Sequence, residues 1–224
     1  MSQPVLTPVP ERNPADTKER LLAAAERLFA ERGFDGTSMR EITQAAGCSV
    51  SAANYHFGNK EALWSAVLRQ RLAPMNRDRL AALERAVRAS AGRPLALEGV
   101  FEAFFRPPID QLAQRRRAGP HSFPRQVMAR LYSEAPARAA ALKAELFGEV
   151  TERFRAALGE ALPGAGDDTL ALIEQLSVAS LVHVLSGQIA EGSLASEPDH
   201  EALVRALVLH AAAGARALAT GARG

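Results

Sequence analysis

The sequence has 224 residues, 47% of them hydrophobic, and a formal net charge of +2. This composition excludes a chain that is disordered throughout, and the lack of a run of about 18 uncharged apolar residues argues against a membrane-spanning helix. Ala, Leu, Glu and Arg are abundant and aromatic residues make up only 5%, which predicts an all-α protein.

The chain opens with a segment that predicts no regular structure. Residues 1–15 contain four prolines and no apolar periodicity, so we expect a disordered arm. The first helix is expected to begin at Asp16 or Thr17, either of which can cap it, and to end at Gly33. Its apolar positions share one face at helical spacing: Leu21, Ala25, Leu28 and Phe29.

Two short helices follow. Ser38 and Glu41 form a capping-box pattern at the start of the first, and Gly47 ends it. Ser49 can cap the second, which Gly58 ends. The positions expected to be buried are Met39, Ile42, Ala46, Val50, Ala53 and Phe57. Two short helices joined by a glycine-containing turn and packed on a longer one are typical of a helix-turn-helix.

The rest of the chain, from residue 63 to 219, has a helical pattern. Breaks are expected at Pro74, Gly92–Pro94, Pro107–Pro108, Gly119–Pro120, Pro136, Pro163–Gly166 and Glu197–Pro198. Two long helices, about 168–191 and 199–219, are rich in Ala and Leu, and small residues allow helices to approach closely. They favour a four-helix dimer interface, although ordinary core packing would produce a similar pattern.

The helix over residues 50–57 carries the residues with the most specific chemistry. Its outward positions are Ser51, Ala52, Asn54, Tyr55 and His56. Asn can pair with adenine, Ser with several base edges and Ala with the thymine methyl group, while Tyr, His and helix N-termini bind phosphates. The alternative is a short capped helix whose Tyr-His-Phe run only packs against its neighbours.

The whole stretch from residue 16 to 68 resembles the N-terminal DNA-binding domain of TetR-family transcriptional regulators. The residues that carry the resemblance are Ala24, Ala25, Leu28, Phe29, Gly33, Phe34, Thr37, Met39, Arg40, Ile42, Ala45, Ala46, Gly47, Ser49, Tyr55, His56, Phe57, Lys60, Glu61, Ala62 and Leu63. Asn54 departs from the commonest motif, which has an aromatic residue there. The Asn-Tyr-His-Phe version is shared by a subset that includes regulators of fatty-acid metabolism and of efflux.

The resemblance implies an all-helical homodimer with a helix-turn-helix domain at 16–62 and an effector-binding and dimerisation domain at 63–219. The first would bind a palindromic operator, and a small apolar or amphipathic molecule in the second would release the DNA, as in a repressor. Phosphate contacts would come from Thr37, Ser38, Tyr55, His56 and Lys60, and base contacts from Arg40, Ser51, Ala52 and Asn54. Lys18 and Ser49, near the starts of their helices, complete the expected DNA-binding set.

The net charge of the expected DNA-binding domain gives little support for DNA binding by itself. Residues 1–60 contain seven Lys and Arg and seven Asp and Glu residues, so binding must depend on where the charges lie. Arginines at 69, 71, 77 and 79 could add a positive field, although a solvated helix face is the favoured interpretation.

The effector site is much less specified. Its candidate residues are Phe101, Phe104, Phe105, Ile109, Phe123, Met128 and His183. The first three lie at i, i+3 and i+4, and such a stripe more often packs in a core than binds a ligand. The run Arg115–Arg117 could form a cationic mouth for an acidic effector such as a fatty acid or its coenzyme A ester, but a solvated loop is the favoured interpretation.

Other functions find no support in the sequence. Cys48 is the one cysteine, so no internal disulfide is possible, and with no secretory signal we expect a cytoplasmic protein. In its helix-turn-helix position Cys48 is expected to be a small core residue. We expect no metal, no cofactor, no membrane partner and no enzymatic activity, because the histidine spacing and the catalytic motifs are lacking. A DNA-binding regulator without an effector, and a helical enzyme with a dispersed site, remain as alternatives.

Overall fold

The computed structural model describes residues 14–117, 136–186 and 199–221. These residues form helices and loops and contain no strand, which confirms the predicted all-α fold for this part of the chain. Most of the expected N-terminal arm, residues 1–13, lies outside the described residues.

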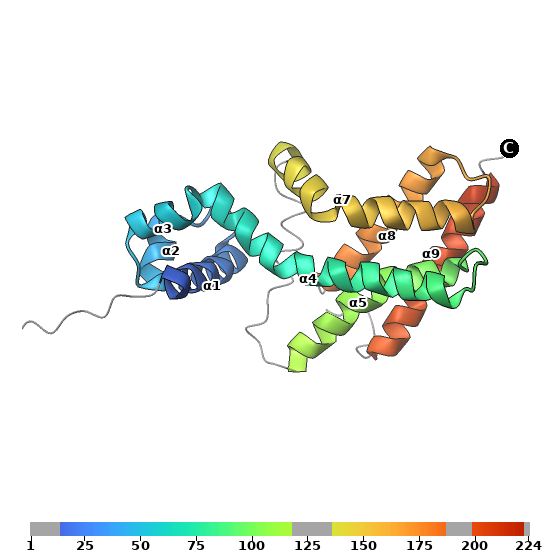
Figure 1. Cartoon of the computed structure of the whole chain (residues 1–224), viewed down its shortest axis with the longest axis horizontal. Helices are drawn as coiled ribbons and strands as arrows, with labels where there is room; N and C mark the ends of the chain where they lie inside the picture. Colours follow the sequence, from blue (N-terminus) through green and yellow to red (C-terminus); the bar gives the residue numbers. More distant parts are fainter. Residues whose placement is uncertain (1–13, 118–135, 187–198, 222–224) are drawn as a thin grey trace, which may run out of the picture. The chain divides into compact units, whose positions relative to one another are not determined.

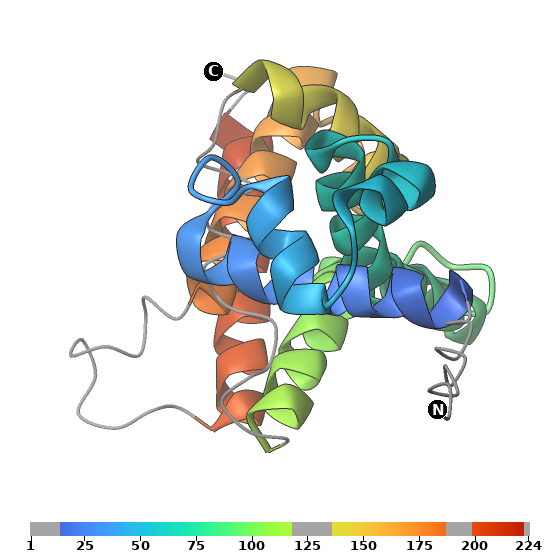
Figure 2. The same cartoon turned by 90° about the vertical axis from the view of Figure 1, so that its left-hand side faces the viewer.

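The chain divides into two compact units, Met1–Leu68 and Arg69–Gly224. The first contains α1 (Pro14–Arg32), α2 (Met39–Ala46), α3 (Val50–Phe57) and the start of α4 (Lys60–Ala89) (Figures 1 and 2). The second contains the rest of α4 with α5 (Leu97–Arg117), α7 (Pro136–Ala161), α8 (Asp167–Leu185) and α9 (His200–Gly221). The domain boundary expected after residue 62 and the division after Leu68 both fall within α4.

The first helix starts two residues earlier than the cap pattern indicates. α1 begins at Pro14, because the fixed φ angle of proline suits the first turn and its missing N–H would have no helical partner there. Asp16 and Thr17 are therefore inside the helix and do not cap it. Asp16 instead forms an ion pair with Arg20 at 3.4 Å, one turn further on.

The caps of the next two helices are as predicted. Ser38 and Glu41 form the complete capping box of α2, and Gly47 ends this helix in the left-handed conformation, with φ of 61°. Ser49 caps α3, since its side chain accepts a hydrogen bond from the backbone N–H of Ala52 at 3.1 Å. Gly58, at φ of 80°, ends α3.

An aromatic cluster forms the core of the first unit. The ring of Phe29 lies 4.9 Å from that of Trp64 and 5.9 Å from that of Phe34. The predicted apolar face of α1 is confirmed, because Leu21, Ala25, Leu28 and Phe29 are all buried. In α3 only Ala53 is buried, whereas Val50 is 44% exposed and Phe57 is half-buried. Met39 of α2 is half-buried too. A two-turn helix packs through its middle, so its ends stay partly uncovered.

Two of the predicted breaks are wrong. Pro74 lies inside α4, and Pro107 and Pro108 lie inside α5. A proline in a helix leaves the carbonyl four residues earlier without its usual N–H partner. For Pro108 this is the carbonyl of Phe104, which accepts a hydrogen bond at 3.1 Å from Nε of the buried Arg79. A side chain from another helix thus offsets part of the cost of the proline. The predicted breaks at Gly92–Pro94 and Pro163–Gly166 are confirmed, and α7 begins at Pro136. The predicted breaks at Gly119–Pro120 and Glu197–Pro198 lie outside the described residues.

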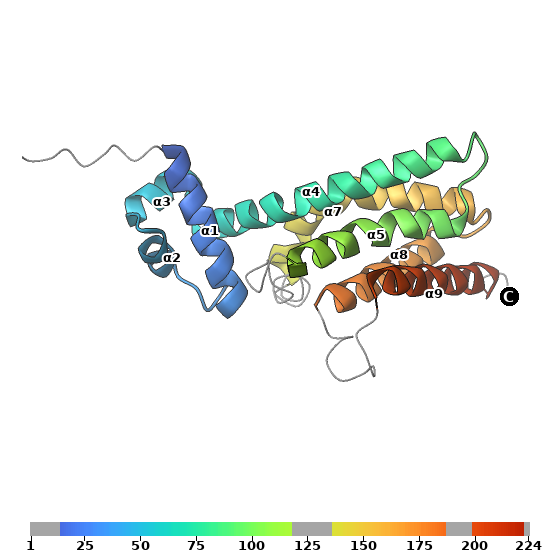
Figure 3. The same cartoon turned by 90° about the horizontal axis from the view of Figure 1, so that it is seen from below.

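In the second unit α5 and α9 lie side by side (Figure 3). Arg106 of α5 binds Glu201 at the start of α9 at 2.8 and 3.0 Å, and Glu98 at the start of α5 binds Arg216 near the end of α9 at 2.6 Å. The two helices are therefore antiparallel. Hydrogen bonds from these arginines hold the pKa values of Glu98 and Glu201 below their usual range.

The two long C-terminal helices leave apolar side chains exposed. Leu172 and Leu176 of α8 are 45% and 52% exposed, and Leu209 of α9 is 58% exposed. By length and hydropathy alone both helices could cross a membrane. The lack of a long uncharged apolar run had argued against any membrane-spanning helix. Both carry charged residues and pack on each other and on α5. The last residues of the predicted helix 168–191 lie outside the described part.

Candidate nucleic-acid interface

The exposed face of α3 is the centre of the candidate site. Asn54 and Tyr55 are exposed, with Tyr55 at 85%, and the exposed Ser51 lies one turn before Tyr55. Ala52 and His56 are half-buried, and the rings of Tyr55 and His56 meet edge to face at 5.3 Å. Because Ala53 anchors the opposite side of the helix, one face carries an amide, two hydroxyls and an imidazole outward. These groups can reach base edges and phosphates.

Two further predicted residues are exposed on neighbouring helices. Arg40 lies in the first turn of α2, and Lys18 lies in the first turns of α1. Each is a cation close to a helix N-terminus, where the backbone dipole also favours an anion. Both remain candidates for contacts with DNA.

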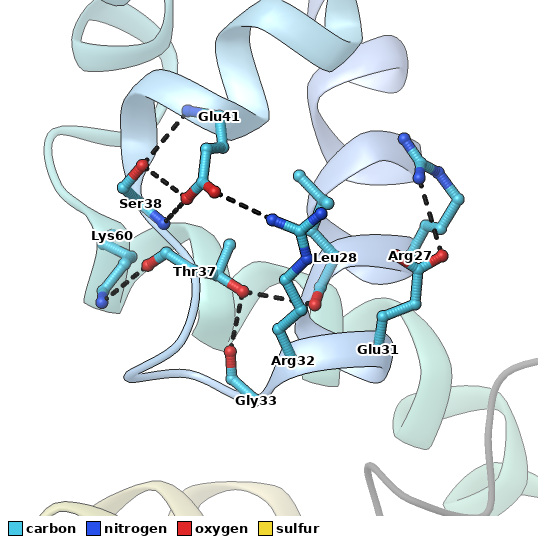
Figure 4. Close-up of polar contacts among 9 residues, drawn as sticks. All are labelled: Arg27, Leu28, Glu31, Arg32, Gly33, Thr37, Ser38, Glu41 and Lys60. Carbon is cyan, nitrogen blue, oxygen red and sulfur yellow. Dashed lines mark hydrogen bonds and ion pairs between the residues drawn. The ribbon is translucent and has the colours of Figure 1, made fainter.

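A network of polar contacts joins the end of α1 to the start of α2 (Figure 4). The backbone N–H and the hydroxyl of Ser38 donate to Oε2 of Glu41 at 2.9 and 2.7 Å, and Arg32 donates to Oε1 at 2.8 Å. The hydrogen bonds from Ser38, with the charge of Arg32, hold the pKa of Glu41 below its usual range. The carboxylate therefore fixes how α2 follows α1.

This depressed pKa predicts a dependence of stability on pH. A carboxyl group whose pKa is lower in the folded state stabilises the fold above its unfolded pKa, roughly pH 4.3 for Glu, and this stability is lost as the pH falls through the folded value. Glu41→Gln should remove that part of the pH dependence. Urea unfolding between about pH 3 and pH 7 measures it. Identical pH profiles for Glu41→Gln and the wild type would contradict the assignment.

Thr37 is buried, which removes its side chain as a phosphate contact, whereas Lys60 binds two backbone carbonyls and keeps its third N–H for a phosphate. Thr37 is 2% exposed, and its hydroxyl donates to the carbonyls of Gly33 and Leu28 at 2.8 and 3.2 Å. Nζ of Lys60 donates to the carbonyl of Thr37 at 2.9 Å (Figure 4). It also donates to the carbonyl of Phe34 at 3.0 Å and lies 4.1 Å from the centre of the Phe34 ring. These two residues hold the loop between α1 and α2 in place.

Ser38 and Ser49 are the N-cap residues of α2 and α3. The hydroxyl proton of Ser38 is donated to Glu41, so it is not available for a phosphate oxygen, and Ser38 is withdrawn as a hydroxyl contact. The oxygen of Ser49 accepts from the N–H of Ala52, which leaves its hydroxyl proton for another acceptor. Ser49 is therefore kept among the DNA-binding candidates.

The sequence did not point to Arg20. Its guanidinium joins α1 to the turn between α2 and α3, with Nη2 3.5 Å from Sγ of Cys48. The Cys48 thiol donates to the carbonyl of Ala46 at 3.4 Å. Cys48 is half-buried, so it is less buried than the core residue that was expected at this position. A contact over 28 positions leaves no periodic pattern that sequence analysis could use.

The second unit contains a cavity of about 1010 Å³ between α4, α5, α7 and α8. Of the predicted effector residues, Phe104 and His183 line it. Phe101, Phe105 and Ile109 are buried, and the rings of Phe101 and Phe105 stack at 6.0 Å. They belong to the core around the cavity and not to its wall, because one stripe on a helix faces two different neighbours. Phe123 and Met128, and the side chains of Arg115–Arg117, lie outside the described residues.

Sequence analysis missed most of the cavity wall. Met75 and Arg79 come from α4, and Phe147 and Phe154 come from α7. Aromatic residues are few in this sequence, so Phe147 and Phe154 could have been considered as candidates. Arg79 was expected on a solvated helix face, but it is buried, with an exposure of 4%. Within the described ranges, no cluster of three His, Cys, Asp or Glu side chains could hold a metal ion.

Known proteins match both units. The family described as "Bacterial regulatory proteins, tetR family" matches residues 21–67, and "Tetracyclin repressor-like, C-terminal domain" matches residues 102–214. The HTH-type transcriptional repressor AcnR of Corynebacterium efficiens is 39% identical over 62 residues, or 28% of this chain and 33% of AcnR. The HTH-type transcriptional regulator RutR of Escherichia coli K12 is 45% identical over 53 residues, or 24% of this chain and 25% of RutR.

Solved structures extend the likeness in fold to most of the chain. The fatty acid degradation regulator FadR from Bacillus halodurans has a TM-score of 0.63 at 15% identity, over 91% of this chain and 97% of FadR. The hemolysin II transcriptional regulator HlyIIR has a TM-score of 0.58 at 17% identity, over 88% of this chain and 98% of HlyIIR. With a helix-turn-helix in the first unit and both family matches in chain order, the protein belongs to the TetR family of bacterial transcriptional regulators.

Proposed function

We propose that the protein is a cytoplasmic homodimeric repressor that binds a palindromic operator through α3 and leaves it when a small molecule occupies the cavity of the second unit. The observation that supports this most is the outward face of α3, where Ser51, Asn54 and Tyr55 are exposed on a short helix capped at both ends. A major groove admits such a helix, and a two-fold dimer matches a palindrome.

Tyr55→Phe should weaken binding to every DNA sequence about tenfold, because one hydroxyl hydrogen bond to a charged phosphate is lost. Tyr55 is 85% exposed, so the fold should not change. The slope of log affinity against log salt should also stay unchanged, since no charge is removed. Fluorescence anisotropy with operator and unrelated duplexes tests this. A loss confined to the operator would instead place Tyr55 among the base-reading residues.

Asn54→Ala should relax the preference at one operator position in each half-site. Asn reads adenine through two hydrogen bonds, a contact worth about 1–3 kcal/mol of discrimination. Sequence selection with the variant and the wild type measures the effect, and Ser51→Ala on the same exposed face is a control that should alter a different position. An unchanged consensus would remove Asn54 from the base-reading set.

The dimer is proposed to form through α8 and α9. Leu172 and Leu176 of α8 and Leu209 of α9 are exposed, and α9 also exposes a set of small residues beside charged ones: Ala202, Ala206, Ala213, Gly214 and Ala217. Large exposed apolar residues together with small ones suit close helix packing between two copies. Sedimentation velocity at micromolar concentration tests this: a dimer is expected, and a monomer would contradict it.

A further inference from the structure

We infer that a second copy of the chain completes the wall of the cavity in the second unit, so that a molecule in the cavity contacts both protomers and tightens the dimer. Because this names the partner that closes the effector site, it rests on the homodimer proposed above. Two properties of α8 support it: the exposure of the residues that line the cavity, and the spacing of the exposed residues along the helix.

The cavity is partly open to solvent. Three residues of α8 line it and are exposed in the single chain: Gln175, Ala179 and His183. Each lies four residues after the one before, so they follow one another along one side of the helix. Ala144 and Gly148 of α7 also line the cavity and are exposed. Within the described part of the chain, the wall is therefore incomplete between α7 and α8.

The open side of the cavity lies on the same face of α8 as the exposed leucines. Four exposed residues of this face recur at spacings of four, three and four: Leu172, Leu176, Ala179 and His183. At 3.6 residues per turn they lie within about 60° of one another around the helix axis. Alternating spacings of three and four are typical of the seam between two packed helices. This face therefore has the pattern of a helix interface, although it is exposed in the single chain.

A second copy of the chain suits this face. A two-fold axis brings the same face of both chains together, so the face must be compatible with itself. None of its four residues carries a carboxylate, an ammonium or a guanidinium group, so no such like charges meet there. The leucines of one chain then pack beside the residues that border the opening in the other. The second copy thus supplies apolar side chains on the side where the cavity is open.

Closure of the cavity by a second copy links ligand binding to dimer formation. A molecule that contacts both protomers binds the dimer more tightly than the monomer, and by linkage it must also strengthen the dimer. Release from the operator would then come from a change within the dimer and not from its dissociation into monomers.

The linkage can be tested on the unaltered full chain with N-phenyl-1-naphthylamine, an uncharged probe whose fluorescence rises in apolar sites. Titrations at protein concentrations below and above the midpoint of dimer formation compare the affinities of monomer and dimer for the probe. The dimer should bind it at least about tenfold more tightly. Sedimentation velocity should show that saturating probe moves the midpoint to lower protein concentration. Equal affinities, an unmoved midpoint or no binding by the dimer would each overturn the inference.

Leu209→Glu should weaken the dimer from a position outside the cavity wall. Leu209 is 58% exposed on α9 and is not among the described residues that line the cavity. The monomeric variant should bind the probe at least about tenfold more weakly, and protein concentrations that restore the dimer should restore the affinity. Val87→Glu is the matched control, because Val87 is 46% exposed on α4 and should leave both the dimer and the probe affinity unchanged. A monomeric Leu209→Glu variant with the affinity of the wild-type dimer would show that one chain completes the cavity alone.

Val178→Trp shows where the probe binds. Val178 is half-buried and lines the cavity from α8, so the larger side chain should weaken probe binding and abolish the effect of the probe on the dimer. Circular dichroism must show that the variant is folded. Unchanged probe binding would place the probe outside this cavity and overturn the inference.

These measurements contain no DNA, so their outcome is separate from that of the repressor function. A probe that strengthens the dimer of a protein that selects no DNA sequence would leave the shared cavity standing and the repressor function refuted. A dimer that selects an operator but binds the probe no better than the monomer would give the reverse.

Discussion

Replacing Leu176 and Leu209 together with glutamate should convert the dimer into monomers and lower operator affinity at least about 100-fold, or roughly 2.7 kcal/mol. Leu176 is 52% and Leu209 58% exposed in the single chain, on the two helices proposed to form the interface. Four unpaired carboxylates would then be buried per dimer, at a cost that a packed helical interface does not offset. A monomer has one recognition helix, so it gains binding free energy from one half-site only.

A matched control is available on α4. Val87 is 46% exposed and lies on neither α8 nor α9, so Val87→Glu should leave the dimer and its operator affinity unchanged. Analytical ultracentrifugation gives the oligomeric state, and fluorescence anisotropy gives the affinity. A double variant that remains a tight dimer would show that α8 and α9 do not form the interface.

Phe29→Ala should destabilise the first unit by about 3–5 kcal/mol and abolish DNA binding at ambient temperature. The Phe29 side chain is fully buried between the rings of Phe34 and Trp64. Its removal leaves a cavity in a unit whose core is small, and a domain's whole stability is only about 5–15 kcal/mol. Without this core α3 has no support, because Ala53 alone of its residues is buried.

The chain's one tryptophan makes this measurement direct. Trp64 packs on Phe29, so its fluorescence during urea unfolding reports on this core. Val50→Ala is the control. Val50 is 44% exposed, and its truncation should change stability by no more than about 0.5 kcal/mol. A loss below about 1 kcal/mol in Phe29→Ala would contradict the assigned core.

The parts of the fold that depend on neighbouring residues could be predicted from the sequence. The capping box of Ser38 and Glu41, the cap at Ser49 and the left-handed Gly47 all lie within four residues of the groups they satisfy. Their energetics are local, so the pattern alone locates the helix ends. The buried face of α1 could also be predicted, because its apolar residues recur at helical spacing in the sequence.

The wrong predictions concern features that depend on residues far away in the sequence. Pro108 should end a helix, yet α5 continues because Arg79, 29 positions earlier in the numbering, supplies a donor to the freed carbonyl of Phe104. Lys60 was expected only as a cation for phosphate, and its ammonium group also binds carbonyls 26 and 23 positions away. No local pattern contains such contacts. The effector residues were poorly located for the same reason, since a cavity is built from four helices.

Selection of bound sequences from a pool of random duplex DNA, with the purified protein at about 150 mM salt, tests the central claim most directly. A palindromic consensus with half-sites about one helical turn apart, or a multiple of it, is the predicted result. The same selection with Tyr55→Phe should yield the same consensus at lower recovery. A folded protein that enriches no sequence would contradict the repressor function.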